Sequence, residues 1–128
     1  MKEMAYRLET AKPFEQVASE LEKLTPARGF RVLAIHDTKA TLAEKGFEIE
    51  PLKIFEVCNA GFAYKALGKN IDTALFMPCK IVVRSEKGKT YLALMKPSLI
   101  AEFLPGSGLE ELAVEVEKQI IEIMNEVA

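Results

Sequence analysis

The sequence predicts an α+β domain in which helices pack on a mixed or mostly antiparallel sheet. Helical and strand patterns are mixed along the chain, and the clearest hairpin is expected over residues 79–96. No fixed-period repeat, linker or low-complexity stretch interrupts the 128 residues, a length typical of one domain. We therefore expect one compact α+β domain over residues 1–128.

The N-terminal part of the chain predicts a strand, a helix and a second strand. Met4 to Glu9 alternates well enough for a strand. Pro13 suits the first turn of a helix, which Pro26 and Gly29 are expected to end. The strand over Phe30 to Ile35 is apolar on both sides and is expected to be buried. The apolar stripe of the helix consists of Phe14, Val17, Ala18, Leu21 and Leu24.

The middle of the chain predicts short elements separated by glycine and proline. Asp37 or Thr38 is expected to cap a short helix through Ala43, which Gly46 closes. Pro51 opens a strand over residues 52–58. A turn over residues 59–61 leads to a short helix over residues 62–69, and residues 70–78 are expected to form a loop.

The C-terminal part predicts a hairpin and the strongest helix of the protein. The hairpin strands are expected over residues 79–85 and 89–96. Pro97-Ser98 is expected to start a short helix over Leu99 to Phe103. Ser107 and Glu110 have the spacing of a capping box, which predicts a helix start at Ser107. The stripe of that helix consists of Leu109, Leu112, Ala113, Val116, Ile120, Ile123, Met124 and Val127.

Charge and cysteine usage narrow the functional classes. The chain carries 17 Lys and Arg against 19 Asp and Glu, without the basic cluster that nucleic-acid binding usually requires. The N-terminus lacks an apolar signal-peptide region, and no apolar run approaches the roughly 18 residues of a membrane span. Two cysteines without a disulfide framework favour a reducing compartment. We expect a cytoplasmic protein that binds neither nucleic acid nor membranes.

Excess apolar surface predicts a homodimer. Both faces of the hairpin strands are largely apolar, whereas a sheet with one wet face shows polar residues at every second position. The last helix also carries Val114 and Ile121 outside its main stripe. Helices on both sheet faces would hide part of this surface within one chain. A two-fold dimer is the other way to bury it, and is the one we expect.

The candidate chemical residues are His36, Cys58 and Cys79, the only histidine and the only cysteines. His36 and Cys58 each end a predicted strand, so parallel strands would place them at one edge of the sheet. Cys79 joins Cys58 only if its strand runs antiparallel to the one before. Convergence would allow a labile metal site or a redox-active thiol pair. Free cysteines, however, usually behave as small buried hydrophobes.

Glu56 is a second candidate, because it interrupts an apolar strand on the side of Cys58. A buried carboxylate has a raised pKa and can exchange protons. The alternatives are a pairing with a lysine of a neighbouring strand or a place on an edge. Gly106-Ser107-Gly108 is not a dinucleotide fingerprint, and no nucleophile elbow or phosphate loop is present.

Several fragments together resemble the Domain of Unknown Function 302 family over roughly residues 5–97. They are Phe14 with its helix, Gly29-Phe30, Leu42 with Lys45-Gly46, Val57-Cys58-Asn59 with Ala63 and Leu67, and Met77-Pro78-Cys79-Lys80. Ala60 stands where usual members have a proline. The resemblance implies a compact α+β fold, dimers, and a pocket framed by Cys58, Asn59, Pro78 and Cys79. It supplies no activity, cofactor or catalytic residue.

Three functional hypotheses follow. The first is a non-catalytic homodimeric module that binds a small ligand or a protein partner near the strand ends. The second is a thiol- or metal-based redox or sensor protein that uses Cys58, Cys79 and His36. The third, a hydrolase or transferase using Glu56 and His36, lacks a visible activated nucleophile.

Overall fold

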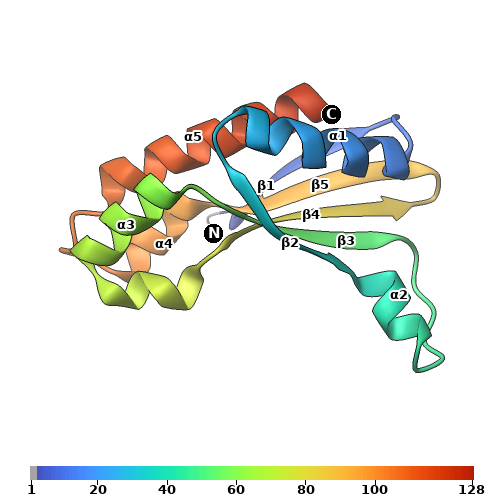
Figure 1. Ribbon diagram of the computed structural model, residues 1–128, viewed down its shortest axis with the longest axis horizontal. Coiled ribbons are helices and arrows are strands. Elements are labelled where there is room, and N and C mark those ends of the chain that lie inside the picture. Colours follow the sequence, from blue (N-terminus) through green and yellow to red (C-terminus); the bar gives the residue numbers. More distant parts are fainter. Residues whose placement is uncertain (1–2) are drawn as a thin grey trace.

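One five-stranded antiparallel sheet, in the order β1-β5-β4-β3-β2, organises the computed structural model, which describes residues 3–128 (Figure 1). Its strands are β1 (Ala5–Thr10), β2 (Arg31–Asp37), β3 (Leu52–Cys58), β4 (Cys79–Glu86) and β5 (Lys89–Met95). The helices are α1 (Phe14–Ala27), α2 (Thr38–Ala43), α3 (Ala60–Lys69), the 3₁₀ helix η1 (Ile71–Phe76), α4 (Pro97–Phe103) and α5 (Glu110–Val127). The predicted α+β class is confirmed.

The two faces of the sheet differ in their covering. Helices α1 and α5 both lie on the same face, which we call the closed face (Figure 1). Its strand side chains are almost fully buried against the stripes of the two helices: Phe55, Val57, Ile81, Val83, Leu92 and Leu94. Within residues 3–128, no helix layer covers the opposite face, which we call the open face (Figure 1). Its side chains include Ile54, Glu56, Lys80, Val82, Arg84, Tyr91 and Ala93.

The β4–β5 hairpin was predicted almost to the residue. Glu86 pairs with Lys89, so only Lys87 and Gly88 lie between the strands. Both have positive φ, 49° and 81°, as a two-residue turn of type I′ requires. Glycine at the second position adopts this conformation without a steric penalty.

Helix α1 extends past Pro26, which the sequence predicted to end it. A proline within a helix removes one hydrogen bond, here to the carbonyl of Glu22. Glu22 is exposed, so water can solvate that carbonyl. The buried Thr25 hydroxyl also donates to the carbonyl of Leu21 at 2.7 Å, which fastens the last turn. The helix ends instead at the Arg28 cap, before Gly29 at φ 85°.

Strand β2 is not buried, contrary to the sequence expectation, because it lies at the edge of the sheet. Leu33 is 50% exposed and Ile35 is 36% exposed. The register shifts between Val32 and Ala34, which leaves Leu33 without a partner in the β3 ladder. An apolar run therefore marked an edge strand here, and periodicity alone did not distinguish it from a central one.

Residues 70–78 are not the irregular loop that the sequence predicted, since they contain η1. Asn70 starts this helix by accepting a hydrogen bond from the amide of Asp72 at 2.9 Å. The buried Thr73 hydroxyl donates to the Asn70 carbonyl at 2.6 Å. Hydrogen bonds of Asn70 and Thr73 with nearby backbone groups thus hold this short helix, which has no long apolar pattern from which it could be predicted.

The predicted capping box at Ser107 does not form. The Ser107 hydroxyl donates to the carbonyl of Leu104 at 2.6 Å, behind it in the chain. Gly106 and Gly108 both have positive φ, so the chain changes direction twice and the serine faces α4. Helix α5 begins later, at Glu110, where two acidic residues in the first turn favour its N-terminal end.

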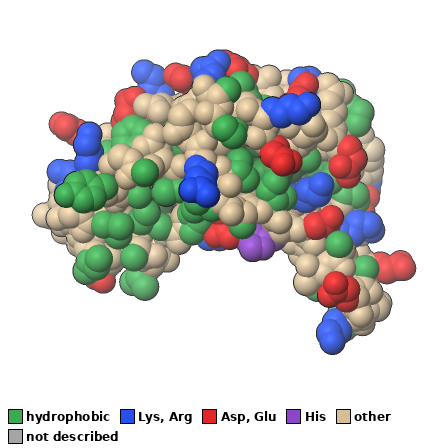
Figure 2. Space-filling view, in the orientation of Figure 1, with side chains coloured by type: hydrophobic (Ala, Val, Ile, Leu, Met, Phe, Trp, Pro, Cys, Tyr) green, Lys and Arg blue, Asp and Glu red, His purple; other side chains and the backbone are tan. Residues whose placement is uncertain are grey.

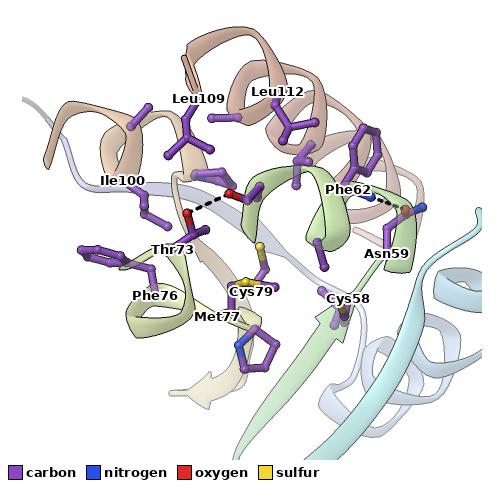
Figure 3. A pocket seen from close by; sticks show the side chains of 18 of the residues that line it. Cys58, Asn59, Phe62, Thr73, Phe76, Met77, Cys79, Ile100, Leu109 and Leu112 are labelled. Atoms are coloured by element: carbon purple, nitrogen blue, oxygen red, sulfur yellow. Dashed lines mark hydrogen bonds between the residues drawn. The ribbon is translucent and has the colours of Figure 1, made fainter. Parts of the chain in front are cut away.

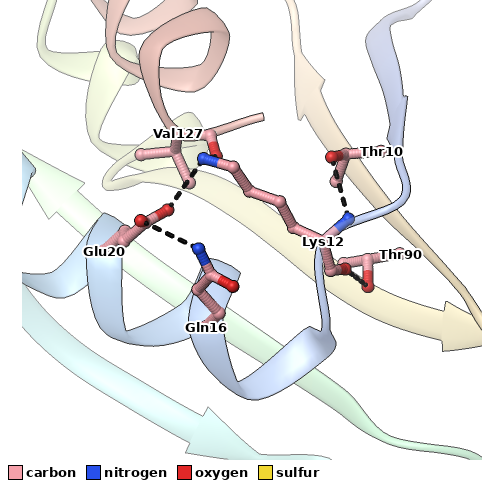
Figure 4. Close-up of polar contacts among 6 residues, drawn as sticks. All are labelled: Thr10, Lys12, Gln16, Glu20, Thr90 and Val127. Carbon is pink, nitrogen blue, oxygen red and sulfur yellow. Dashed lines mark hydrogen bonds and ion pairs between the residues drawn. The ribbon is translucent and has the colours of Figure 1, made fainter.

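Lys12 ties the N-terminal and C-terminal parts together (Figure 4). Its ammonium donates to the carbonyl of Val127 at 3.0 Å and to Glu20 Oε2 at 3.2 Å. Its backbone carbonyl accepts from the hydroxyl of Thr90, which is 2% exposed, at 2.7 Å. One residue therefore joins the end of α5, helix α1 and strand β5.

The ends of the molecule reach past the open face. Helix α2 and the following residues, 38–50 in all, project away from the body, and we call this segment the arm (Figure 1). No residue of α2 is buried. At the other end lie α3, η1 and α4. Figure 2 shows the surface hollowed between that end and the arm. None of the helices over residues 3–128 is both long and apolar enough to cross a membrane.

Candidate functional site

An apolar cavity of about 90 Å³ lies where β3 ends and β4 begins (Figure 3). Helices α3, α4 and α5 and the 3₁₀ helix η1 enclose it. Its lining comes from segments far apart in the sequence: Phe30, Val57, Cys58, Asn59, Phe62, Ala63, Ala66, Thr73, Phe76, Met77, Pro78, Cys79, Pro97, Ile100, Ala101, Leu109, Leu112, Ala113 and Val116. A cavity at the strand ends was expected, whereas its walls from η1, α4 and α5 were not.

Asn59 holds the N-terminal end of α3 against the sheet. Its Oδ1 accepts a hydrogen bond from the amide of Phe62 at 3.0 Å and so caps the helix. Its Nδ2 donates to the carbonyl of Gly29 at 3.0 Å, just before β2. A side chain added at Gly61 would lie 3.3 Å from Asn59 Oδ1, a close approach that favours glycine there. Asn59 is therefore a structural part of the wall, with both ends of its amide in use.

Thr73 is the other polar side chain in the lining, and its hydroxyl is also engaged. It donates to the carbonyl of Asn70 at 2.6 Å and lies 3.4 Å from the carbonyl of Ala66 (Figure 3). Over residues 3–128, no buried side-chain nitrogen or oxygen lacks a hydrogen-bond partner. The cavity consequently presents mainly hydrocarbon and sulfur surface, and both of its polar side chains, Asn59 and Thr73, already have hydrogen-bond partners within the chain.

Cys79 contributes a protonated thiol to the cavity. Burial raises the pKa of its thiol to about 11, and neighbouring Cys58 raises it further in the same direction. At neutral pH the thiolate, which is the reactive form, is therefore scarce. Cys79 packs against the hydrophobic core and acts there as an apolar group.

The structure brings Cys58, Asn59 and Cys79 to one place. Strands β3 and β4 are antiparallel, and Val57 pairs with Cys79 across them. Both cysteines line the cavity, and neither forms a disulfide within the described chain. The Met77-Pro78 peptide that precedes Cys79 is cis and lies in the same wall.

His36 and Glu56 lie together, but away from the cavity. Strands β2 and β3 are antiparallel, so His36 pairs with Ile54 while Cys58 pairs with Arg31 at the far end of β2. His36 Nε2 is 2.5 Å from Glu56 Oε1 on the open face. The partner of Glu56 is thus a histidine of the edge strand. Among residues 3–128, no three His, Cys, Asp or Glu side chains gather closely enough to hold a metal ion.

The residues that sequence reasoning missed are Thr73, Phe76, Ile100, Leu109 and Leu112. Phe76 falls in residues 70–78, which the sequence predicts to be a loop, and no apolar period there indicates that its side chain turns toward a cavity. The leucines were assigned to the core stripe of α5, which does turn part of that stripe toward the cavity. Nothing local indicated that α4 and α5 reach the ends of β3 and β4.

Comparison with known proteins bears on the whole of this architecture. A family model described as "Domain of unknown function DUF302" matches residues 6–127. The chain belongs to this family. The resemblance found in the sequence over residues 5–97 is confirmed, and the match continues through α5.

This DUF302 protein is also similar to a solved structure. That structure is described as "uncharacterized conserved protein DUF302 from Bacillus stearothermophilus". The two chains are 28% identical, 98% of each is covered, and the TM-score is 0.92. No curated protein matches the chain. Neither description states an activity, so a function must be argued from the cavity and the surfaces.

Proposed function

We propose that this DUF302 protein is a non-catalytic module that binds a small uncharged apolar molecule in the cavity and works as a homodimer. One observation carries the ligand: the cavity is lined by apolar groups, and its polar side chains are already hydrogen-bonded within the chain. A charged or strongly polar ligand would lose its hydration there without replacement. An apolar ligand forms no hydrogen bonds with water and therefore has none to replace.

The size of the cavity limits the ligand. Its 90 Å³ is smaller than the roughly 150 Å³ engineered cavity that admits benzene or xenon. It therefore accommodates a molecule of a few carbon atoms, or the end of a longer apolar chain. Alanine at positions 63, 66, 101 and 113 keeps this space free of larger side chains.

Binding is favoured over thiol chemistry by the surroundings of Cys79. The raised pKa of its thiol opposes nucleophilic attack. The two candidate proton carriers, His36 and Glu56, pair with each other on the open face and do not line the cavity. A thiol-based reaction would need the thiolate that burial disfavours.

Binding is tested with xenon and n-pentanol while the methyl resonances of Ile100, Leu112 and Val116 are followed by NMR. We expect saturable shifts at these residues. An Ala66→Leu variant should abolish them, because its added methyl groups fill the cavity. Ala60→Leu, on the exposed start of the same helix, is the matched control and should bind as wild type does. Absence of saturable shifts in the wild type would remove the ligand proposal.

The open face supports the homodimer. Val82, Ile54 and Ala93 remain half-buried there, beside one another in the β3–β4–β5 register. They lie between charged side chains such as Lys80 and Arg84, a mixture typical of interfaces that form between folded subunits. A two-fold dimer lays this face against the same face of a second copy.

The dimer is tested by sedimentation equilibrium at micromolar concentrations. We expect the wild type to sediment as twice 14.3 kDa. Val82→Glu should shift it to the single chain, because a larger, charged side chain would lose its hydration at the centre of the interface. Circular dichroism of the variant checks that the subunit stays folded. A wild type that remains a single chain throughout would overturn the proposed dimer.

A further inference from the structure

Large apolar side chains are exposed at both ends of the open face. Phe47, near the tip of the arm, is 64% exposed. Ile71 and Leu75 of η1 are 71% and 80% exposed. Single exposed leucines need no explanation, but a projecting phenylalanine at one end and an apolar pair at the other suggest surfaces that a partner covers.

The hollow between these ends leaves room for a second copy of the same shape (Figure 2). In a two-fold dimer, the same surface of both subunits takes part. A two-fold axis along the viewing direction of Figure 1, through the middle of the hollow, brings the open faces together and exchanges the two ends. In that arrangement the arm of each copy meets η1 of the other.

We propose that the arm clasps a second copy of the chain, with Phe47 of each copy packing against Ile71 and Leu75 of its partner. This inference rests on the proposed homodimer and adds the residues that hold it. The occupant of both exposed surfaces is this same protein.

The two ends extend the surface that the sheet face offers to a second copy. The sheet has five strands of six to eight residues. With strands about 4.8 Å apart and a rise of about 3.3 Å per residue, its face covers roughly 500 Å² in projection, and its accessible surface is larger because side chains stand up from it. Stable interfaces bury about 800 Å² of accessible surface on each partner. Contact at the two ends adds the exposed surfaces of Phe47, Ile71 and Leu75 to that of the sheet face.

Charge also matches the arm to the opposite end. The charged side chains of the arm are Lys39, Glu44, Lys45, Glu48 and Glu50, which give it a net negative charge. Lys39 additionally donates to the carbonyl of Ile49 at 2.6 Å and holds the loop. Helix α3 and η1 carry Lys65, Lys69 and Asp72, with a net positive charge. All of these charged side chains are solvent-exposed. Contact of the arm with α3 and η1 therefore brings opposite net charges together, while Glu102 of α4 adds a negative charge further along the same end.

The clasp is tested first with Phe47→Glu and Leu75→Lys, measured separately by sedimentation equilibrium. Both residues are exposed in the single subunit, so the fold should survive either change. We expect each variant to raise the dimer dissociation constant about tenfold or more, as loss of an aromatic anchor does. Val114→Ser is the matched control. Val114 is 57% exposed on α5, in the layer over the closed face, and its substitution should leave the constant unchanged.

The reciprocal contact is tested by cross-linking. Phe47→Cys and Leu75→Cys proteins are mixed and oxidised with copper phenanthroline, and the covalent dimer is measured on a non-reducing gel. A disulfide requires Cα atoms within about 7 Å, so the mixture should yield more covalent dimer than either variant alone. Wild-type protein, with Cys58 and Cys79, gives the background.

The outcomes separate this inference from the dimer itself. A wild type that never dimerises would overturn both proposals. A wild-type dimer that Val82→Glu separates, but Phe47→Glu and Leu75→Lys leave intact, would overturn the clasp and keep the face-to-face dimer. A mixture that cross-links no better than its components would likewise reject the contact between Phe47 and Leu75.

Discussion

The closed and open faces belong to the same five strands, yet they differ in burial and in the charged side chains that they carry. On the closed face, Ile81, Val83, Leu92 and Leu94 are no more than 1% exposed beneath α1 and α5. On the open face, Val82 is only half-buried between Lys80 and Arg84. The closed face has the uniform apolar composition of a core. The open face alternates apolar and charged groups, which is typical of a protein surface.

The difference between the faces shows that the apolar residues of a strand do not by themselves indicate which face is covered. Both sides of β4 and β5 are rich in apolar residues, and this predicted that both would be covered. The positions of the charges distinguish them. Lys80, Arg84 and Glu56 all fall on one side of the sheet, the side that α1 and α5 leave uncovered in the described part of the chain. The guanidinium of Arg84 lies over the ring of Tyr91, 4.5 Å from its centroid, and keeps its own charge in water.

The largest expected contrast is a large-to-small substitution on each face. Leu92→Ala should lower the free energy of unfolding by about 2–5 kcal/mol, because it leaves a cavity among fully buried neighbours. Val82→Ala on the adjacent strand should cost less than about 1 kcal/mol at concentrations where the protein is a single subunit. Urea unfolding monitored by circular dichroism measures both. Equal losses would mean that the open face is as much a core as the closed one.

A smaller effect should follow from Cys79, which faces the covered side. Its thiol pKa is raised from an ordinary value of 9.0 to about 11 in the fold. As pH rises through this interval, the unfolded chain loses the proton first, so stability falls. We expect a loss of about 2 kcal/mol by pH 11 from this thiol alone.

The comparison of variants isolates the Cys79 contribution from other groups that titrate at high pH. Unfolding free energies under reducing conditions are measured at pH 8 and pH 10.5 for wild type, Cys79→Ala and Cys58→Ala. The drop with pH should be smaller in Cys79→Ala, whereas Cys58→Ala should keep most of the wild-type drop. Identical drops in all three proteins would contradict a buried, protonated Cys79.

The smallest contrast concerns neighbouring residues of β5 that face opposite sides. Thr90→Val removes the donor to the part-buried carbonyl of Lys12 and should cost about 1 kcal/mol. Tyr91→Leu removes the exposed contact with Arg84 and should cost about 0.5–1 kcal/mol. Thermal unfolding distinguishes them. A larger effect of Tyr91→Leu would show that the cation contact matters more than the hydrogen bond of Thr90.

Elements set by local chemistry could be predicted from the sequence. Asp37 accepts from the amide of Ala40 at 3.0 Å and caps α2, as expected. Strand β3 occupies the predicted residues 52–58 because Pro51 and Asn59 bound it. The start of α5 could not be predicted, because Ser107 had two backbone partners within reach and the turns at Gly106 and Gly108 decided between them. Such a choice depends on where α4 lies.

The candidate site was predictable only in part, for a topological reason. Cys58, Asn59 and Cys79 lie in one wall of the cavity, because β3 ends and β4 begins at that wall. In the chain, α3 and η1 lie between these two strands. Whether His36 joins these three residues depends on the direction of β2 relative to β3, which no local pattern contains. The antiparallel pairing places His36 nearer the opposite end, beside Glu56. Residues such as Leu112, which come from α5, reach the cavity only through tertiary packing.

The shift of register in β2 also limits how copies of this chain can meet. A regular edge strand offers its backbone groups to a neighbour, and sheets can then grow without end. The unpaired Leu33 breaks that repeat at one border of the sheet, and Arg7 and Glu9 place charge along the other, on β1. Both edges of the sheet therefore carry features that disfavour lateral growth into fibrils.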